Sequence, residues 1–459
     1  MSSNPIRCFG SILLVITSCP ALVSADEIVD WNRITSEVLV TDTNYQNPDM
    51  ASRSMAMVNL AMYDAVNGVI PRHQQIYSHA PAPVGANANA AAVEAAYHVL
   101  SSIYPEQQAY LQGERTSSLS MIPDGPGKTD GVAFGAAVGA TVMQARANDG
   151  FDNMVPYVPQ TGAGHWEPDP LNPTQEAWGP EWGQLETFAL QSSGQMMPPA
   201  MPDLTSQAYT DAFNEVKELG SVNSTSRTPE QTEIALFWAY DRLGMGTPMR
   251  LYSDIMCTVA TSEGNDLSDN ARMFAMTATS VADAGIVAWD SKFQFDFWRP
   301  VSGIRRADED GNPDTIADPN WTPMGAPGGI GPDGEPIPDF TPPFPTYLSG
   351  HASFGGAMFR SLENFFGSDD IAFEIGSEEM PGITRSFSSF SEASEENSRS
   401  RVYLGIHWNF DDTEARTMGS SAADFIAANH FHAVPEPSAV LLTMLGAMCL
   451  VARSRQARR

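Results

Sequence analysis

Apolar residues recur at steps of three and four along much of this chain, and this period restricts it to a largely helical fold. In residues 54–69, for example, Met55, Val58 and Met62 fall on one face of an amphipathic helix, and Gly68 marks its expected end. No run of period-two alternation is as strong, so the sequence predicts an all-α protein. The same spacing predicts further helices at 91–103, 131–147, 230–243, 247–261 and 268–289.

Two long segments rich in proline and glycine interrupt the helical pattern, at 157–182 and 308–345. Loops of this length in a compact enzyme commonly border a site or form a lid, although a plain excursion of the chain is the alternative. The second segment ends next to Ser349-Gly350-His351. We therefore predict that it forms part of the rim of a pocket.

The charge balance excludes one class of partner. The 459 residues include 25 Lys and Arg against 55 Asp and Glu, a formal net charge of −30. Nonspecific nucleic-acid binding depends on basic surfaces that displace counterions from phosphates, so we expect no nucleic-acid partner. Of the four cysteines only Cys257 lies between the two ends of the chain, because Cys8 and Cys19 fall in the N-terminal leader and Cys449 in the C-terminal apolar run. No intrachain disulfide framework is expected after processing.

The N-terminus has the pattern of a signal peptide. Arg7 precedes an apolar run at 9–23, which ends in the small residues VSA at 23–25. A short buried core segment is the alternative, but it is unusual at the extreme N-terminus. We expect signal peptidase to remove residues 1–25 and the mature chain to begin near Asp26.

The C-terminus has a second sorting pattern. VPEPS at 434–438 leads into an apolar run at 439–451, which four arginines follow. The run is shorter than the ~20 residues of a comfortable spanning helix, so it predicts a transient membrane anchor. Residues 434–459 resemble the PEP-CTERM tail of Gram-negative bacteria. That resemblance implies cleavage by an exosortase and a final location in the cell envelope, on the cell surface or in the extracellular matrix.

Three short segments in the last third of the chain carry the residues that could bind an anion. In the first, KFQFDFWRP at 292–300, Lys292 and Arg299 are seven residues apart. If the segment is helical, both cations point the same way and Pro300 ends or kinks the helix after the arginine. A solvated basic face is the alternative.

The second segment, Ser349-Gly350-His351, directly precedes a probable helix. Ser349 is suited to the N-cap, and Gly350 lets the backbone approach a ligand closely. Free N–H groups in such a first turn attract anions, and His351 could exchange a proton with a bound one. A capping serine beside an incidental histidine is the alternative.

In the third segment, SRVYLGIH at 400–407, Arg401 and His407 are six residues apart and would fall on different faces of an ideal helix. Gly405 between them predicts a break that lets both reach one point. Arg401 can clamp an oxyanion through two hydrogen bonds, and His407 can act as a nucleophile or as a ligand to a central atom. The segment alone leaves both roles open.

Together, K-x6-R-P, S-G-H and S-R-x5-H in this order resemble the signature of the vanadium-dependent haloperoxidases and of the related PAP2 phosphatases. Leu348 stands where that family usually has proline. The residues around Trp289, at 295–299, at 342–344 and at 404–408 further resemble the fungal chloroperoxidase type. The resemblance implies two four-helix bundles with long Pro/Gly-rich loops, divided into an N-terminal helical region at 26–225 and a catalytic bundle at 226–432.

The resemblance also implies a role for each site residue. His407 would bind vanadium, His351 would serve as the acid–base histidine, and Asp241 would orient His351. Trp289 and Phe344 would line the halide side of the pocket. The hydrogen-bond donors to the oxygens of the vanadate cofactor would be Lys292, Arg299, Ser349, Gly350 and Arg401.

The implied activity is the oxidation of halide by hydrogen peroxide to hypohalous acid. A PAP2-type phosphatase acting on a phosphate ester is the alternative, because vanadate and phosphate are similar in size and shape and His407 could form a phosphohistidine. A structural matrix protein is a third possibility, suggested by the sorting tail alone. It would have no reason to keep buried lysine and arginine, which are costly without an anion.

Overall fold

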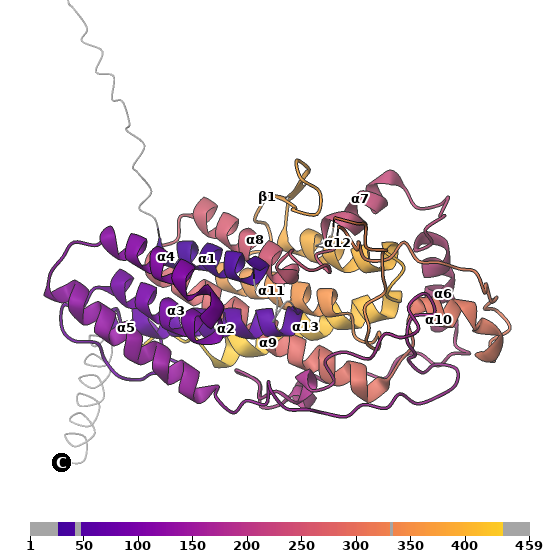
Figure 1. Cartoon of the computed structure of the whole chain (residues 1–459), viewed down its shortest axis with the longest axis horizontal. Coiled ribbons are helices and arrows are strands. Elements are labelled where there is room, and N and C mark those ends of the chain that lie inside the picture. The colour runs from indigo at the N-terminus through magenta and orange to yellow at the C-terminus, as the bar shows by residue number, and fades with distance from the viewer. Residues whose placement is uncertain (1–25, 42–46, 331–333, 435–459) are drawn as a thin grey trace, which may run out of the picture.

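The structure is a computed structural model that describes residues 26–41, 47–330 and 334–434. The predicted signal peptide and nearly all of the predicted sorting tail lie outside the described residues. The described part is mainly helical, with one short β-hairpin (Figure 1). Its α-helices are α1 Glu27–Thr41, α2 Pro48–Val69, α3 Ala88–Ile103, α4 Gln108–Ser120, α5 Pro126–Ala145, α6 Gln207–Leu219, α7 Pro229–Phe237, α8 Thr247–Glu263, α9 Leu267–Phe295, α10 Pro300–Arg305, α11 Gly350–Phe366, α12 Phe390–Tyr403 and α13 Asn409–Asn429.

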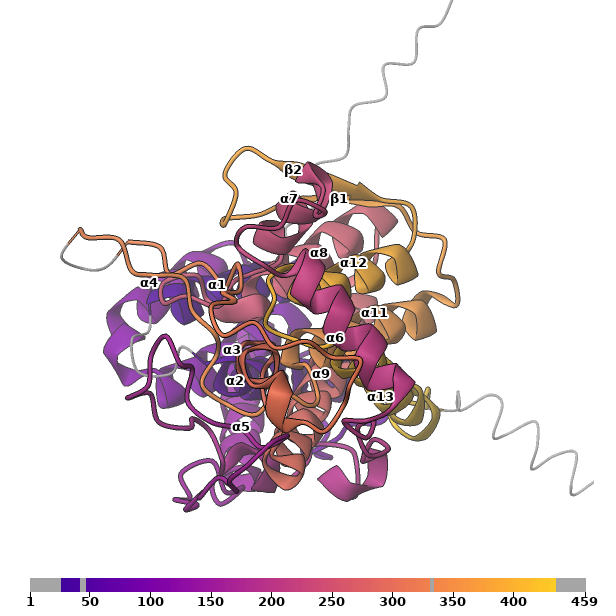
Figure 2. The same cartoon turned by 90° about the vertical axis from the view of Figure 1, so that its right-hand side faces the viewer.

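The helices form two bundles that share one hydrophobic core. In the first, α2, α3 and α5 pack together, with α1 and α4 against them. In the second, α11 lies between α9, α12 and α13, and α6 crosses α12 and α13 in the end view (Figure 2). Helix α2 also packs along α9, and the buried side chains of both groups form one continuous cluster. The predicted all-α class is therefore confirmed, although the antiparallel hairpin of β1 Phe373–Gly376 and β2 Thr384–Phe387 was not predicted.

Each predicted helix has a counterpart, and the one at 230–243 differs in a way that matters for the site. Helix α7 ends at Phe237, six residues early. The chain then adopts positive φ angles at Tyr240, Gly244 and Gly246. A right-handed α-helix cannot continue through residues in this conformation. Asp241 therefore lies on a loop.

Helix α2 ends at Val69, the predicted last residue and one position after Gly68. A Cβ on Gly68 would lie 2.4 Å from Cζ of Phe134 on α5, so the glycine allows the two helices to pack closely.

The two Pro/Gly-rich segments meet beside the second bundle. The N–H of Trp178 in the first segment donates to the carbonyl of Pro343 in the second, at 2.9 Å. Both segments contribute residues to the wall of the cavity described below, including Trp178 and Phe344. The prediction that the second segment borders a pocket is confirmed.

A buried ionic cluster fastens the first bundle to the loop that follows it. Asp149 accepts hydrogen bonds from Nε of Arg53 at 2.8 Å and from Nε of Arg146 at 2.9 Å. Arg146 also donates to the carbonyls of Glu186 and Thr187. In the same region the carboxylate of Asp283 accepts the N–H groups of residues 188–190, at 2.6 to 2.9 Å.

Among the described helices, none is both long enough and apolar enough to cross a membrane. Cys257 is buried and forms no disulfide with any described residue.

Candidate active site

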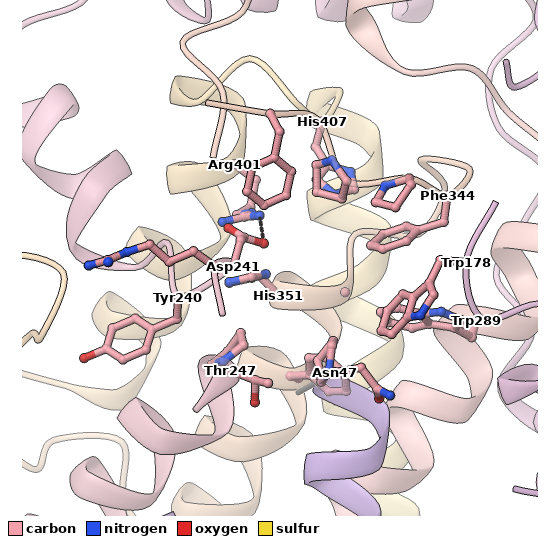
Figure 3. Close-up of a pocket in the computed structure, with 18 of the residues that line it drawn as sticks. Asn47, Trp178, Tyr240, Asp241, Thr247, Trp289, Phe344, His351, Arg401 and His407 are labelled. Carbon is pink, nitrogen blue, oxygen red and sulfur yellow. Dashed lines mark hydrogen bonds and ion pairs between the residues drawn. The ribbon is translucent and has the colours of Figure 1, made fainter. Parts of the chain in front are cut away.

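A cavity of about 400 Å³ opens between the second bundle and the two Pro/Gly-rich segments. Its lining includes Arg401 and His407 at one end, Asn47 and Thr247 at the other, and His351 between them (Figure 3). The aromatic rings of Trp178, Trp289 and Phe344 lie along one side between these ends. Gly350 and Asp241 also line the cavity, whereas Lys292, Arg299 and Ser349 are buried but are not among its lining residues.

Lys292 and Arg299 reach the site by a route that the sequence did not predict. The sequence left open whether the segment is helical throughout; α9 ends at Phe295, and Asp296 adopts a left-handed conformation with φ +53°. Pro300 does not end a helix; it occupies the first turn of α10, where its missing N–H costs nothing, and Arg299 is the N-cap. The turn between the two helices brings both cations to the site.

Lys292 is engaged with the backbone. Its ammonium group donates to the carbonyls of Pro345 and Thr346, at 3.2 and 3.1 Å, and also to that of Leu348. These bonds use all three hydrogens of the ammonium group and fix the backbone segment that leads into Ser349. A direct contact with an anion, as predicted, requires Lys292 to exchange one of these carbonyls.

Two buried arginines retain donors without partners. Arg299 donates to the carbonyls of Phe344 and Ile406, at 2.9 and 2.8 Å, but its Nη2 has no partner among the described residues. Arg401 donates from Nη2 to Asp241 at 2.9 Å, while its Nε and Nη1 are likewise unpartnered within the described part of the chain. An unmet buried charged donor is costly. The site therefore fits an oxyanion that would accept these hydrogens.

The hydrogen bonds of His407 fix which of its nitrogens carries the proton. Nδ1 lies 3.0 Å from Oδ2 of Asp411, a carboxylate that also accepts from the hydroxyl of Thr346. Nε2 lies 3.0 Å from Nη1 of Arg299, which can only donate. The neutral ring consequently has its proton on Nδ1 and a lone pair on Nε2.

Asp411 was missed by the sequence reasoning. It lies four residues after His407, in the first turn of α13, so that one turn of chain brings its carboxylate back to the imidazole. The sequence did contain a signal for this pair, because an acidic residue stands four positions after the candidate histidine.

His351 is oriented by backbone groups, which corrects the prediction for Asp241. Its Nε2 donates to the carbonyl of Ala239 at 2.8 Å, so Nδ1 is the basic nitrogen of the neutral ring. Asp241 is paired with Arg401 instead. Because the predicted helix stops early, the loop that carries Asp241 presents the Ala239 carbonyl to the histidine and the carboxylate to the arginine.

The Ser349 turn has the predicted geometry. Ser349 is the N-cap of α11, and its hydroxyl accepts from the N–H of Ala352. The N–H groups of Gly350 and His351, in the same first turn, have no acceptor within the helix. A Cβ on Gly350 would lie 3.1 Å from the indole of Trp289, so glycine lets this turn pack directly on the aromatic wall.

Gly405 has the predicted positive φ, at +77°. It follows the end of α12, and the break lets Arg401 and His407 line the same cavity.

Burial dominates the electrostatics of the site. It lowers the pKa of His407 and of His351 well below the usual value, and the nearest arginines, Arg299 and Arg401 respectively, lower each further. Both rings are therefore neutral at neutral pH. Burial likewise raises the pKa of Asp411 and Asp241. The site combines three basic side chains with two carboxyl groups whose ionisation is disfavoured, so a bound oxyanion would relieve an excess of positive charge.

The comparisons with known proteins agree with this geometry. The family model described as the VCPO second helical-bundle domain matches residues 272–434, which include Lys292, Arg299, the Ser349 turn, Arg401 and His407. The vanadium chloroperoxidase of Curvularia inaequalis is 31% identical over 505 aligned positions, which cover 87% of this chain and 81% of that protein.

Solved structures share the fold. A bacterial vanadium-dependent iodoperoxidase superposes with a TM-score of 0.73 at 23% identity, over 90% of this chain and 98% of that one. A bacterial vanadium-dependent chloroperoxidase in its holo form superposes with a TM-score of 0.66 at 17% identity, over 87% of this chain and 96% of that one.

Proposed function

Because this chain belongs to the vanadium haloperoxidase family, we propose that it is an exported, vanadate-dependent enzyme that oxidises halide with hydrogen peroxide to hypohalous acid. The observation that carries the proposal is the set of buried donors without partners among the described residues, on Arg299 and Arg401, beside a histidine whose unprotonated Nε2 is in contact with Arg299. A purely structural site would have paired these donors with protein acceptors.

The site residues would have different roles in binding vanadate. Arg299 and Arg401 would donate to its oxygens, together with the N–H groups of the Ser349 turn, and His407 would bind vanadium through Nε2. Asp411 keeps the proton of His407 on Nδ1, so Nε2 is unprotonated and would bind vanadium in exchange for its contact with Arg299. Lys292 fixes the turn through its carbonyl contacts and supports the positive potential. When bound, vanadate supplies the Lewis-acid centre at which hydrogen peroxide becomes reactive toward halide.

His351 would move the proton that the reaction requires. Hydrogen peroxide, halide and one proton give hypohalous acid and water, so the site needs a group that can take a proton and return it. The Nδ1 of His351 is basic, lies at the cavity and is held in one tautomer by the Ala239 carbonyl. Trp289 and Phe344, whose ring centroids are 5.1 Å apart, would give the halide an apolar wall on which it sheds water.

One set of assays separates this function from phosphate-ester hydrolysis, which the same donors could support. Vanadate should switch on bromide oxidation in the purified apo-protein, and phosphate should suppress it competitively. The His407→Ala protein should lose bromide oxidation and bind vanadate more weakly by orders of magnitude in calorimetry, because the only covalent tether is gone. If vanadate inhibits hydrolysis of p-nitrophenyl phosphate but supports no halide oxidation between about pH 4 and 8, the enzyme is a phosphatase.

Export is the part of the proposal that rests on the terminal sequences alone. We expect signal peptidase to cleave near Asp26 and an exosortase to remove the tail beyond about Pro437, leaving the protein in the cell envelope or the matrix outside it. Mass spectrometry of the native protein measures both ends. An intact segment 439–459 would instead indicate a stably anchored protein.

A further inference from the structure

The turn between α9 and α10 is held by a part of the chain that lies 131 to 139 positions earlier. The side chain that makes these contacts is that of Asp296, which is 3% exposed. Its Oδ1 accepts from the hydroxyl of Tyr157. Its Oδ2 accepts from the N–H of Gln160 and from Nδ1 of His165, each at 3.0 Å. Three donors on one carboxylate fix its position.

The backbone of the same turn lies between the two Pro/Gly-rich segments. On one edge, residues 164–166 pair with residues 296–298 through two backbone hydrogen bonds, at 2.8 and 3.1 Å. On the other edge, the N–H of Thr346 donates to the carbonyl of Phe297 at 3.0 Å. We call residues 157–166 the strap. The strap thus contacts the turn through its backbone as well as through the carboxylate.

The conformation of this turn sets the relative placement of two cations of the anion site. Lys292 stands four residues before Asp296 and Arg299 stands three residues after it. The φ of Asp296, at +53°, is disfavoured for a residue with a side chain, although aspartate tolerates it better than most. Because one φ angle redirects all of the chain that follows, the donors that hold Asp296 in this conformation also fix the direction of Arg299 from Lys292.

The strap acts at a distance from the anion. Within the described part of the chain, the cavity wall includes neither Asp296 nor its donors Tyr157, Gln160 and His165. We propose that Asp296 is a positioning residue: held by the strap, it sets the placement of Lys292 and Arg299 and thereby the affinity of the site for its oxyanion. This role rests on the vanadate site of the proposed function and adds a determinant outside the cavity.

Calorimetric titration with vanadate, in the absence of peroxide and halide, tests the positioning role. Asp296→Ala removes the acceptor of all three donors and should weaken vanadate binding by about 10- to 100-fold, the loss typical when a group that orients the ligands of a metal site is removed. Tyr157→Phe removes one hydrogen bond and keeps the ring, whose centroid is 4.8 Å from that of Phe293. It should weaken binding by about 3- to 10-fold, part of the strength of a hydrogen bond to a charged group.

A rescue and a matched control separate positioning from loss of stability. His165→Ala should bind vanadate more weakly, and His165→Asn should recover most of the affinity, because the asparagine amide can donate from nearly the position of Nδ1. Tyr63→Phe is the matched control in the first bundle, where the hydroxyl donates to the carbonyl of Gln74 at 2.8 Å. It should leave the vanadate affinity unchanged even if urea denaturation shows that it lowers the free energy of unfolding as much as Tyr157→Phe.

Equal affinities of the wild type, Asp296→Ala and Tyr157→Phe overturn the positioning role. Equal losses for Tyr63→Phe and Tyr157→Phe also overturn it, because affinity would then follow stability alone. If Asp296→Ala does not fold, Tyr157→Phe and the two variants of His165 decide the outcome. Vanadate binding that depends on Tyr157, in a protein that oxidises no halide, would sink the proposed function and support the positioning role. A wild type that binds neither vanadate nor phosphate would sink both.

Discussion

The arginines Arg53 and Arg146 in the first bundle and Arg299 and Arg401 in the second are buried to the same degree, with 1 to 4% of each residue exposed. Their hydrogen bonding differs. Arg53 and Arg146 share the carboxylate of Asp149, and neither has a buried nitrogen without a partner among the described residues.

At the second site three guanidinium nitrogens have no acceptor within the described residues. Within the described part of the chain, one carboxylate contacts these arginines directly, that of Asp241, and it binds a single nitrogen of Arg401. Burial alone therefore does not mark a functional arginine. What distinguishes the two clusters is whether the protein itself supplies the acceptors, since a buried charge is tolerated only when something pairs with it.

The largest expected effect tests the first cluster. Asp149→Ala leaves two buried guanidinium groups without their carboxylate and should lower the free energy of unfolding by about 3–5 kcal/mol. Urea denaturation measures this loss. The vanadate affinity of the folded fraction should be unchanged, because Asp149 is not part of the cavity. A matching loss of vanadate affinity would mean that the two clusters are not independent.

The second prediction tests the other cluster. Arg299→Ala and Arg401→Ala should each weaken vanadate binding by about 2–4 kcal/mol, or about 30- to 1,000-fold, because each removes charged donors from a buried site. Calorimetry gives the affinities. Arg360 is the control: it pairs with Asp424 and Glu363 at the surface, and Arg360→Ala should leave the affinity unchanged. Equal losses at all three positions would indicate general destabilisation.

The sequence predicted the second cluster far better than the first. Lys292, Arg299, Arg401 and His407 stand in short motifs whose order is informative, and the helical period fixed the class of the fold. The pairing of Arg53 with Asp149 joins residues 96 positions apart and follows no local pattern, so it emerges only from packing.

The backbone near the site departs from the predicted helices where distant parts of the chain determine its conformation. A helix was predicted through 230–243 and considered through 292–299, but positive φ angles at Tyr240 and Asp296 interrupt both segments. These non-glycine residues gave no signal in the sequence, because tertiary contacts determine their conformation. Asp296, for instance, accepts hydrogen bonds from Tyr157 and from the N–H of Gln160, both far away in the chain.

The third prediction concerns pH and tests a buried carboxyl on α9, outside both arginine clusters, that binds the loop after the first bundle. Burial raises the pKa of Asp283 to about 6 from 3.8, against the effect of three backbone N–H groups. The folded state thus holds this proton more tightly than the unfolded state. The resulting stabilisation is fully present below pH 3.8 and is lost as the pH rises through about 6, by about 3 kcal/mol at most.

Urea denaturation at several pH values between 4 and 7 tests the direction of this pH dependence. It compares the free energy of unfolding of the wild type with that of Asp283→Asn. The wild type should lose stability relative to the variant as the pH rises. The opposite slope would mean that the three N–H groups outweigh burial and that Asp283 is ionised when folded.

The smallest expected effect concerns Asp411, which supplies no charge to the anion itself but holds His407. Asp411→Asn keeps the shape and can still present one oxygen to Nδ1, while it removes the charge that strengthens the hydrogen bond and fixes the tautomer. Vanadate affinity and bromide oxidation should each fall about 10- to 100-fold, less than for loss of an arginine. The comparison variant is Asp412→Asn, the adjacent buried carboxyl, which bonds to Ser349 instead of His407. Equal losses for Asp411→Asn and Asp412→Asn would mean that buried charge near the start of α13, rather than the orientation of His407, sets the affinity of the site.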